Sequence, residues 1–83
     1  MNNTIAVIST QNETNLLTVK GALRHMTDSE GDTLEVSNPF GHPHTFVVDL
    51  TDQRNAGALK AQIQEQLNRN KMLRGSRIVI QDY

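Results

Sequence analysis

The spacing of apolar residues switches between strand and helix periods along this chain, and the order of these segments limits the possible folds most. Residues 5–8 are apolar at every position, which is typical of a central strand that is buried on both sides. Residues 33–37 and 45–50 alternate apolar and polar side chains, as half-buried strands do. A further apolar run lies at 77–81. We therefore predict four β-strands.

Strand alternation also assigns faces. In the second predicted strand, Leu34 and Val36 are expected to point inward. The third strand has two distinct sides, and its more apolar side is expected to form part of the core. That side carries Phe46, Val48 and Leu50, whereas Thr45, Val47 and Asp49 lie on the other.

A first helix is predicted between the first two strands. Thr10, followed three residues later by Glu13, has the form of a capping box and predicts that the helix begins there. Leu17 falls outside the apolar stripe and Gly21 weakens the helix, so a hairpin of residues 16–20 with residues 5–8 remains an alternative. The predicted stripe consists of Leu16, Val19, Leu23 and Met26.

A second helix is predicted between the third and fourth strands. Thr51 or Asp52 can cap its start, and Gly75 is a natural place for it to stop. Its apolar stripe consists of Ala56, Leu59, Ile63 and Leu67.

The predicted order is strand, helix, strand, strand, helix, strand. This order resembles the split βαβ arrangement of the ferredoxin-like fold, in which two helices cover one face of a four-stranded antiparallel sheet. The first and third strands are central in that fold, and residues 5–8 and 46–50 are the most continuously apolar pair here. With 83 residues, we expect one α+β domain spanning 1–83.

The composition argues against several kinds of activity. The chain has no cysteine, so disulfides, thiolate metal sites and cysteine nucleophiles are excluded. Neither a glycine-rich phosphate loop nor a Gly-x-Ser-x-Gly motif occurs. We therefore expect no enzyme activity, no cofactor and no bound metal. No apolar run is long enough to span a bilayer, and the first residues lack the basic start of a signal peptide, so the cytoplasm is the expected location.

The connection at 38–44 is the most unusual segment, with two prolines and a glycine. His42 and His44 are two residues apart, so in an extended strand they would point the same way and offer two nitrogens to a metal. A third ligand is not visible in the sequence. Phe40 in this tip is expected either to pack back on the sheet or to contact a partner.

The uncovered face of the sheet is a second candidate surface. It is predicted to show Val47 and Val79, because Phe46 and Val48 should face the helices. An apolar centre inside a polar rim is typical of protein–protein interfaces, and a strand at the sheet edge can pair with a partner strand. The first strand contributes to this face either Ala6 and Ile8 or Ile5 and Val7.

Cations concentrate near the predicted end of the second helix. They could contact phosphates, although they also complement the helix dipole, and the net charge of -1 does not favour a general nucleic-acid binder. The residues concerned are Arg69, Lys71, Arg74 and Arg77.

Two functional hypotheses follow. The first is a small, non-enzymatic protein-binding domain, of the accessory or inhibitor type that phages and mobile elements encode. It would act through the open face or the tip at 40–44, and its partner is another protein or a second copy in a homodimer. The alternative is a nucleic-acid-binding module that uses the basic group. No membrane partner is expected.

Overall fold

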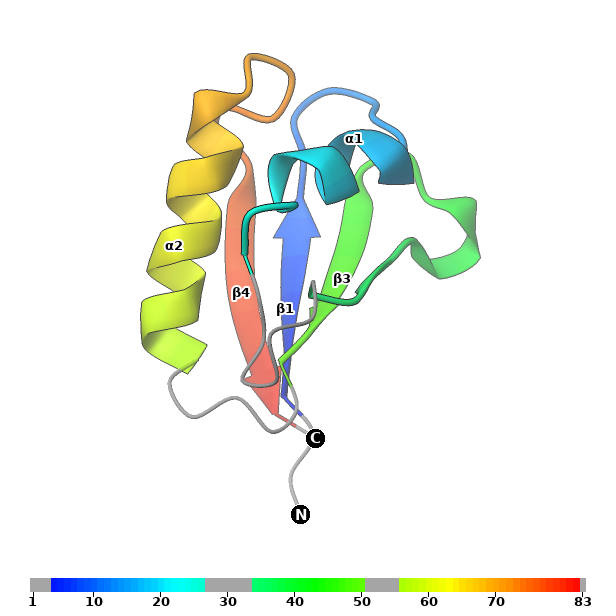
Figure 1. Cartoon of the computed structure of the whole chain (residues 1–83). Coiled ribbons are helices and arrows are strands. Elements are labelled where there is room, and N and C mark those ends of the chain that lie inside the picture. Colours follow the sequence, from blue (N-terminus) through cyan, green and yellow to red (C-terminus); the bar gives the residue numbers. More distant parts are fainter. Residues whose placement is uncertain (1–3, 27–33, 51–55, 83) are drawn as a thin grey trace.

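The computed structural model describes residues 4–26, 34–50 and 56–82, apart from the side chains of Phe40 and Ala56 (Figure 1). Four strands form one sheet in the order β2-β3-β1-β4, and every neighbouring pair is antiparallel. This order confirms the ferredoxin-like topology, with β1 and β3 at the centre. The elements are β1 (Thr4–Ser9), α1 (Leu16–Ala22), β2 (Val36–Ser37), the short 3-10 helix η1 (Pro39–Gly41), β3 (Thr45–Asp49), α2 (Ala56–Arg69) and β4 (Arg77–Asp82).

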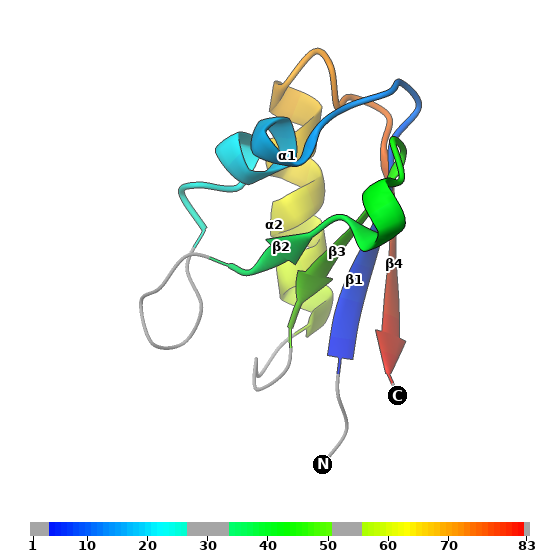
Figure 2. The same ribbon diagram turned by 90° about the vertical axis from the view of Figure 1, so that its right-hand side faces the viewer.

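Both α-helices lie on the same face of the sheet, and neither α1 nor α2 covers the opposite face (Figure 2). The segment at 16–20 therefore belongs to a helix, and the alternative hairpin with the first strand is wrong. Because β1 pairs with β3 on one side and β4 on the other, no position remains for such a hairpin.

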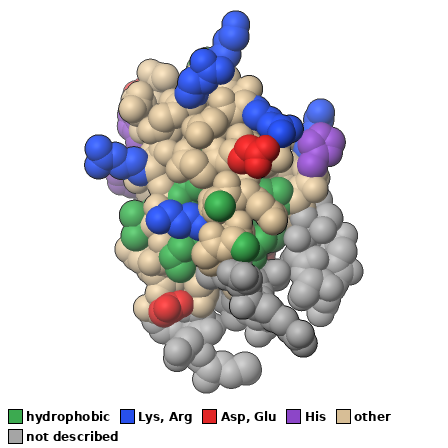
Figure 3. Space-filling view, turned by 90° about the vertical axis from the view of Figure 1, so that its left-hand side faces the viewer, with side chains coloured by type: hydrophobic (Ala, Val, Ile, Leu, Met, Phe, Trp, Pro, Cys, Tyr) green, Lys and Arg blue, Asp and Glu red, His purple; other side chains and the backbone are tan. Residues whose placement is uncertain are grey.

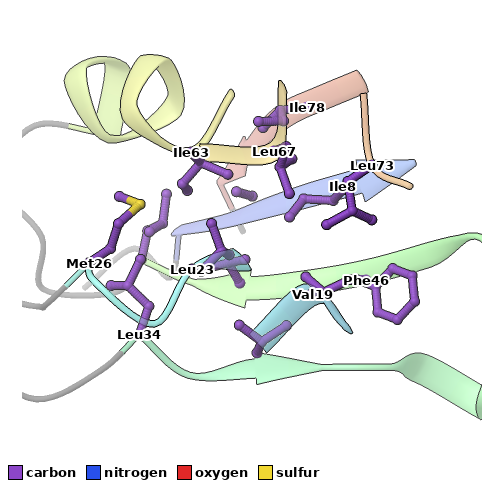
Figure 4. Close-up of a cluster of buried hydrophobic side chains, with 14 residues drawn as sticks. Ile8, Val19, Leu23, Met26, Leu34, Phe46, Ile63, Leu67, Leu73 and Ile78 are labelled. Carbon is purple, nitrogen blue, oxygen red and sulfur yellow. The ribbon is translucent and has the colours of Figure 1, made fainter. Parts of the chain in front are cut away.

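The core fills the space between the sheet and the helices (Figure 4). Phe46 and Val48 of β3 are fully buried there, and Leu34 and Val36 are buried beside them, as the alternation predicts. The helices contribute side chains from their predicted stripes. These are Val19 from α1 and Ile63 and Leu67 from α2, all fully buried.

The start of α1 differs from the sequence prediction. Asn15, not Thr10, is the N-cap, and its side-chain oxygen accepts a hydrogen bond from the Thr18 backbone N–H at 2.9 Å. Thr10 is instead held at the end of β1, where its N–H donates to the His44 carbonyl at 2.8 Å. Its hydroxyl donates to the Asn12 carbonyl at 2.8 Å. Thr10, the cap that the local sequence favours, is thus engaged in a tertiary contact with His44, and Asn15 caps the helix.

The end of α2 is also earlier than predicted. The helix stops at Arg69, and a turn over residues 70–75 leads into β4. Leu73 of this turn is fully buried in the core, a role that the helical stripe did not predict. Gly75 has a φ of +84°, which favours glycine, so it shapes the turn instead of ending the helix. Thr51 and Asp52, the predicted caps, lie outside the described residues.

The open face of the sheet as the candidate site

A row of three valines crosses the uncovered face of the sheet. Val7 of β1 lies directly opposite Val47 of β3 on one side and Val79 of β4 on the other. Val7 and Val47 are half-buried, and Val79 is 52% exposed. Val47 and Val79, the two valines expected on this face, therefore lie on either side of Val7. The structure also assigns the first strand: Ala6 and Ile8 are fully buried beneath the helices, which leaves Ile5 and Val7 on the open face.

Polar residues border the valine row on both sides. Ile5 lies between Asp49 and Gln81 in the row toward the start of β1, and both of these polar residues are exposed. Toward the end of β1, Ser9 lies between Thr45 and Arg77. Asp49 and Arg77 thus lie in different rows, on β3 and β4. The edge strand β2 extends this side of the sheet, because Ser37 lies opposite Val47 and the Asp49 N–H donates to the Glu35 carbonyl at 2.9 Å. We call the three rows together the open face; its members are Ile5, Val7, Ser9, Thr45, Val47, Asp49, Arg77, Val79 and Gln81.

This arrangement suits contact with another macromolecular surface. The branched side chains of the three valines offer van der Waals contact, and the rim offers hydroxyl, amide and charged groups for hydrogen bonds. Such an apolar centre with a polar rim is how many protein interfaces are built. The charged residues of the rim would favour one orientation of a partner, since complementary charges favour one register.

The tip at 38–44, expected to be a loop, is folded tightly and contains the 3-10 helix η1. Asn38 holds it together, because its side-chain amide donates to the carbonyls of His42 and Thr45, the latter at 2.9 Å. Backbone hydrogen bonds then join the tip to the segment after β1. Thr14 N–H donates to the Pro43 carbonyl at 3.0 Å.

The two histidines of the tip have different environments. His42 is exposed after η1, whereas His44 is half-buried with its Nδ1 3.0 Å from the Thr10 carbonyl oxygen. His44 therefore helps to join the tip to the end of β1. The two rings were expected to point the same way only in an extended strand, and both histidines lie before β3 begins at Thr45. Within the described ranges, no group of three or more His, Asp or Glu residues is placed to hold a metal ion. The Phe40 side chain lies outside what is described.

The basic group is distributed over different surfaces. Arg69 forms an ion pair with Glu65 at 2.7 Å, and Arg74 Nε donates to the Asn68 carbonyl at 3.3 Å. Arg77 belongs to the open face, and Lys71 is exposed in the turn. On the side shown in Figure 3, several Lys and Arg side chains stand apart from one another, and one lies against an acidic side chain. The four cations are close in sequence but belong to different elements: Arg69 ends α2, Lys71 and Arg74 lie in the turn, and Arg77 begins β4.

Comparison of the chain with protein-family models, with curated proteins and with solved structures finds no match. In the part of the chain that the structure describes, no helix has the length and apolar character needed to cross a membrane. The candidate site therefore rests on the geometry of the open face. The sequence indicated Val47 and Val79 but left Val7 undecided, because four successive apolar residues carry no alternation.

Proposed function

We propose that this chain is a non-enzymatic protein-binding domain, and that the open face is its contact surface. The observation that carries the proposal is the row of Val47, Val7 and Val79 on the face that neither α1 nor α2 covers. A monomer gains little from apolar side chains that it leaves in contact with water. From the composition of the sequence, we place this binding in the cytoplasm.

The row can supply part of the binding energy. Full burial of a valine side chain stabilises by about 1.5–3 kcal/mol relative to full exposure. Val79 is about half exposed, so its burial would contribute roughly 1 kcal/mol, and the half-buried Val7 and Val47 less. The remaining affinity must come from the polar rim of the open face, where the exposed Arg77 favours a partner with a complementary charge.

A matched pair of variants tests this proposal. Val47→Lys places a charge in the middle of the open face, whereas Leu17→Lys makes the same kind of change on α1, where Leu17 is 78% exposed. The wild-type chain and both variants are immobilised and exposed to a nuclease-treated lysate of the source cells. We expect proteins that the wild type and Leu17→Lys retain and that Val47→Lys loses, followed by direct binding of the purified partner. Equal retention by all three chains would contradict the proposal.

The alternative hypothesis is tested with nucleic acid itself. Arg69 and Arg74 already have local partners, which favours a role in the structure of the helix end over contact with phosphates. Fluorescence anisotropy with short DNA and RNA pools is expected to show no binding at moderate salt. Binding that weakens steeply with salt and is lost in Lys71→Glu would instead favour the nucleic-acid module.

A further inference from the structure

The two edges of the sheet differ in length and in protection. β2 has two residues, so it presents little backbone to a neighbour. β4 has six residues, contains neither proline nor glycine, and has a neighbouring strand on one side only among the described strands (Figure 1). A long edge strand with free backbone donors and acceptors is a template for pairing, and natural proteins usually interrupt such edges.

The sequence of β4 is self-complementary about Val79. If two copies of the strand pair antiparallel with Val79 opposite Val79, then Ile78 lies opposite Ile80, and Arg77 lies opposite Gln81. Each pair lies on one face of the sheet, as antiparallel partners must. Branched apolar residues directly opposite each other stabilise a sheet, and no pair in this register brings like charges together.

We propose that a second copy of this chain pairs along β4, with a two-fold axis at Val79. The two four-stranded sheets would then form one sheet of eight strands. The valine row would continue across the axis, from Val47, Val7 and Val79 of one copy to the same residues of the other. This proposal goes beyond the proposed function, because the pairing needs no other protein and would double the width of the open face.

A second copy fits this edge better than the alternatives that the structure offers. Pairing of β4 with the β2 edge of another copy would leave most of β4 unpaired, because β2 is two residues long. It would also be a head-to-tail contact that continues into a filament, whereas β4 paired with itself closes as a dimer. The flank of α2 beside β4 carries small side chains. Gln64 marks this flank, since its side chain donates to the Ser76 carbonyl at 3.0 Å, and Gly57 and Ala61 lie on the same side of the helix.

The register is tested by charge at the axis. We expect sedimentation velocity to show a dimer for the wild type and association at least about tenfold weaker for Val79→Lys and Val79→Glu, because each variant places like charges directly opposite each other. An equimolar mixture of the two variants should restore the dimer, which also shows that both variants fold. Val47→Lys, on the same face but away from the edge, should leave the dimer intact.

A cysteine cross-link tests the same contact independently, because the chain has no cysteine of its own. Directly opposite residues in an antiparallel pair have Cα atoms about 4.5–5.5 Å apart, within the range that a disulfide spans. Val79→Cys should form a covalent dimer under mild oxidation, and Val47→Cys should not.

Three results would overturn the edge dimer. One is a monomer at every concentration, and another is a variant mixture that stays monomeric. The third is a dimer that Val47→Lys abolishes and Val79→Lys does not, which would indicate face-to-face packing. None of these results decides the proposed function, because protein capture by the open face is measured separately with Val47→Lys and Leu17→Lys.

Discussion

The two faces of the sheet contain similar residues but have different environments, and β1 shows this most clearly. Ala6 and Ile8 are fully buried, whereas Ile5 and Val7, which alternate with them, are only half-buried. All four side chains are apolar, so hydrophobicity alone does not distinguish them. What differs is the cover, since α1 and α2 lie over one face only (Figure 2). An apolar strand therefore indicates that burial would stabilise side chains on both of its faces, but not that the chain itself covers both.

The largest expected effect comes from neighbouring residues on opposite faces of β3. Phe46→Ala removes the largest fully buried side chain of the core and should lower the free energy of unfolding by about 3–5 kcal/mol. Val47→Ala, one residue later on the open face, should cost less than about 1 kcal/mol. Urea denaturation followed by circular dichroism measures both. Similar losses of unfolding free energy at the two positions would contradict the difference in burial between the covered and open faces.

A second comparison lies in the turn before β4. Leu73 is fully buried against the covered face, whereas Met72 beside it is 53% exposed. Leu73→Ala should therefore lower the free energy of unfolding by about 2–4 kcal/mol, and Met72→Ala should leave it within about 0.5 kcal/mol. Thermal unfolding of the two variants provides the measurement. A neutral Leu73→Ala would mean that the turn does not contribute to the core.

The helix cover itself is tested at the start of α1. This helix has seven residues, too few to be stable alone, so its cap and its packing both matter. Asn15→Ala removes the acceptor for the Thr18 N–H and should cost about 1 kcal/mol, whereas Asn15→Ser should keep most of the stability. Amide hydrogen exchange across 16–22 would show whether the loss is local. Equal stability of Asn15→Ala and the wild type would contradict the assigned cap.

Strand periodicity predicted the sheet well because it is a local signal. Phe46, Val48, Leu34 and Val36 alternate with polar or exposed neighbours, so their burial follows from the pattern. The pattern did not predict which side chains of residues 5–8 face the helices, because all four are apolar. Only the pairing of Val7 with Val47 and Val79, which involves residues far apart in the chain, assigned the faces there.

The errors arise where tertiary contacts override local preference. Thr10 has the sequence of a cap, but its backbone pairs with His44, thirty-four positions away, and Asn15 takes its place. At the same junction the His44 ring contacts the Thr10 carbonyl, so His44 and His42 have different environments and do not act as the pair that their spacing suggested. Leu73 was missed because it follows the end of the helix, where helical spacing no longer applies.

The smallest expected effect tests directly whether the open face contacts water. Val7→Thr keeps the shape and the branched Cβ of valine but adds a hydroxyl at the centre of this face. Since Val7 is only half-buried, the hydroxyl can reach water, and the free energy of unfolding should change by no more than about 0.5 kcal/mol. The matched Val48→Thr places the same hydroxyl on the covered face, where valine is fully buried, and should cost about 1–3 kcal/mol. Equal costs would mean that the open face is covered in solution. In that case the cost of Val7→Thr should fall on dilution if a second copy provides the cover, because dilution separates two chains but not two parts of one chain.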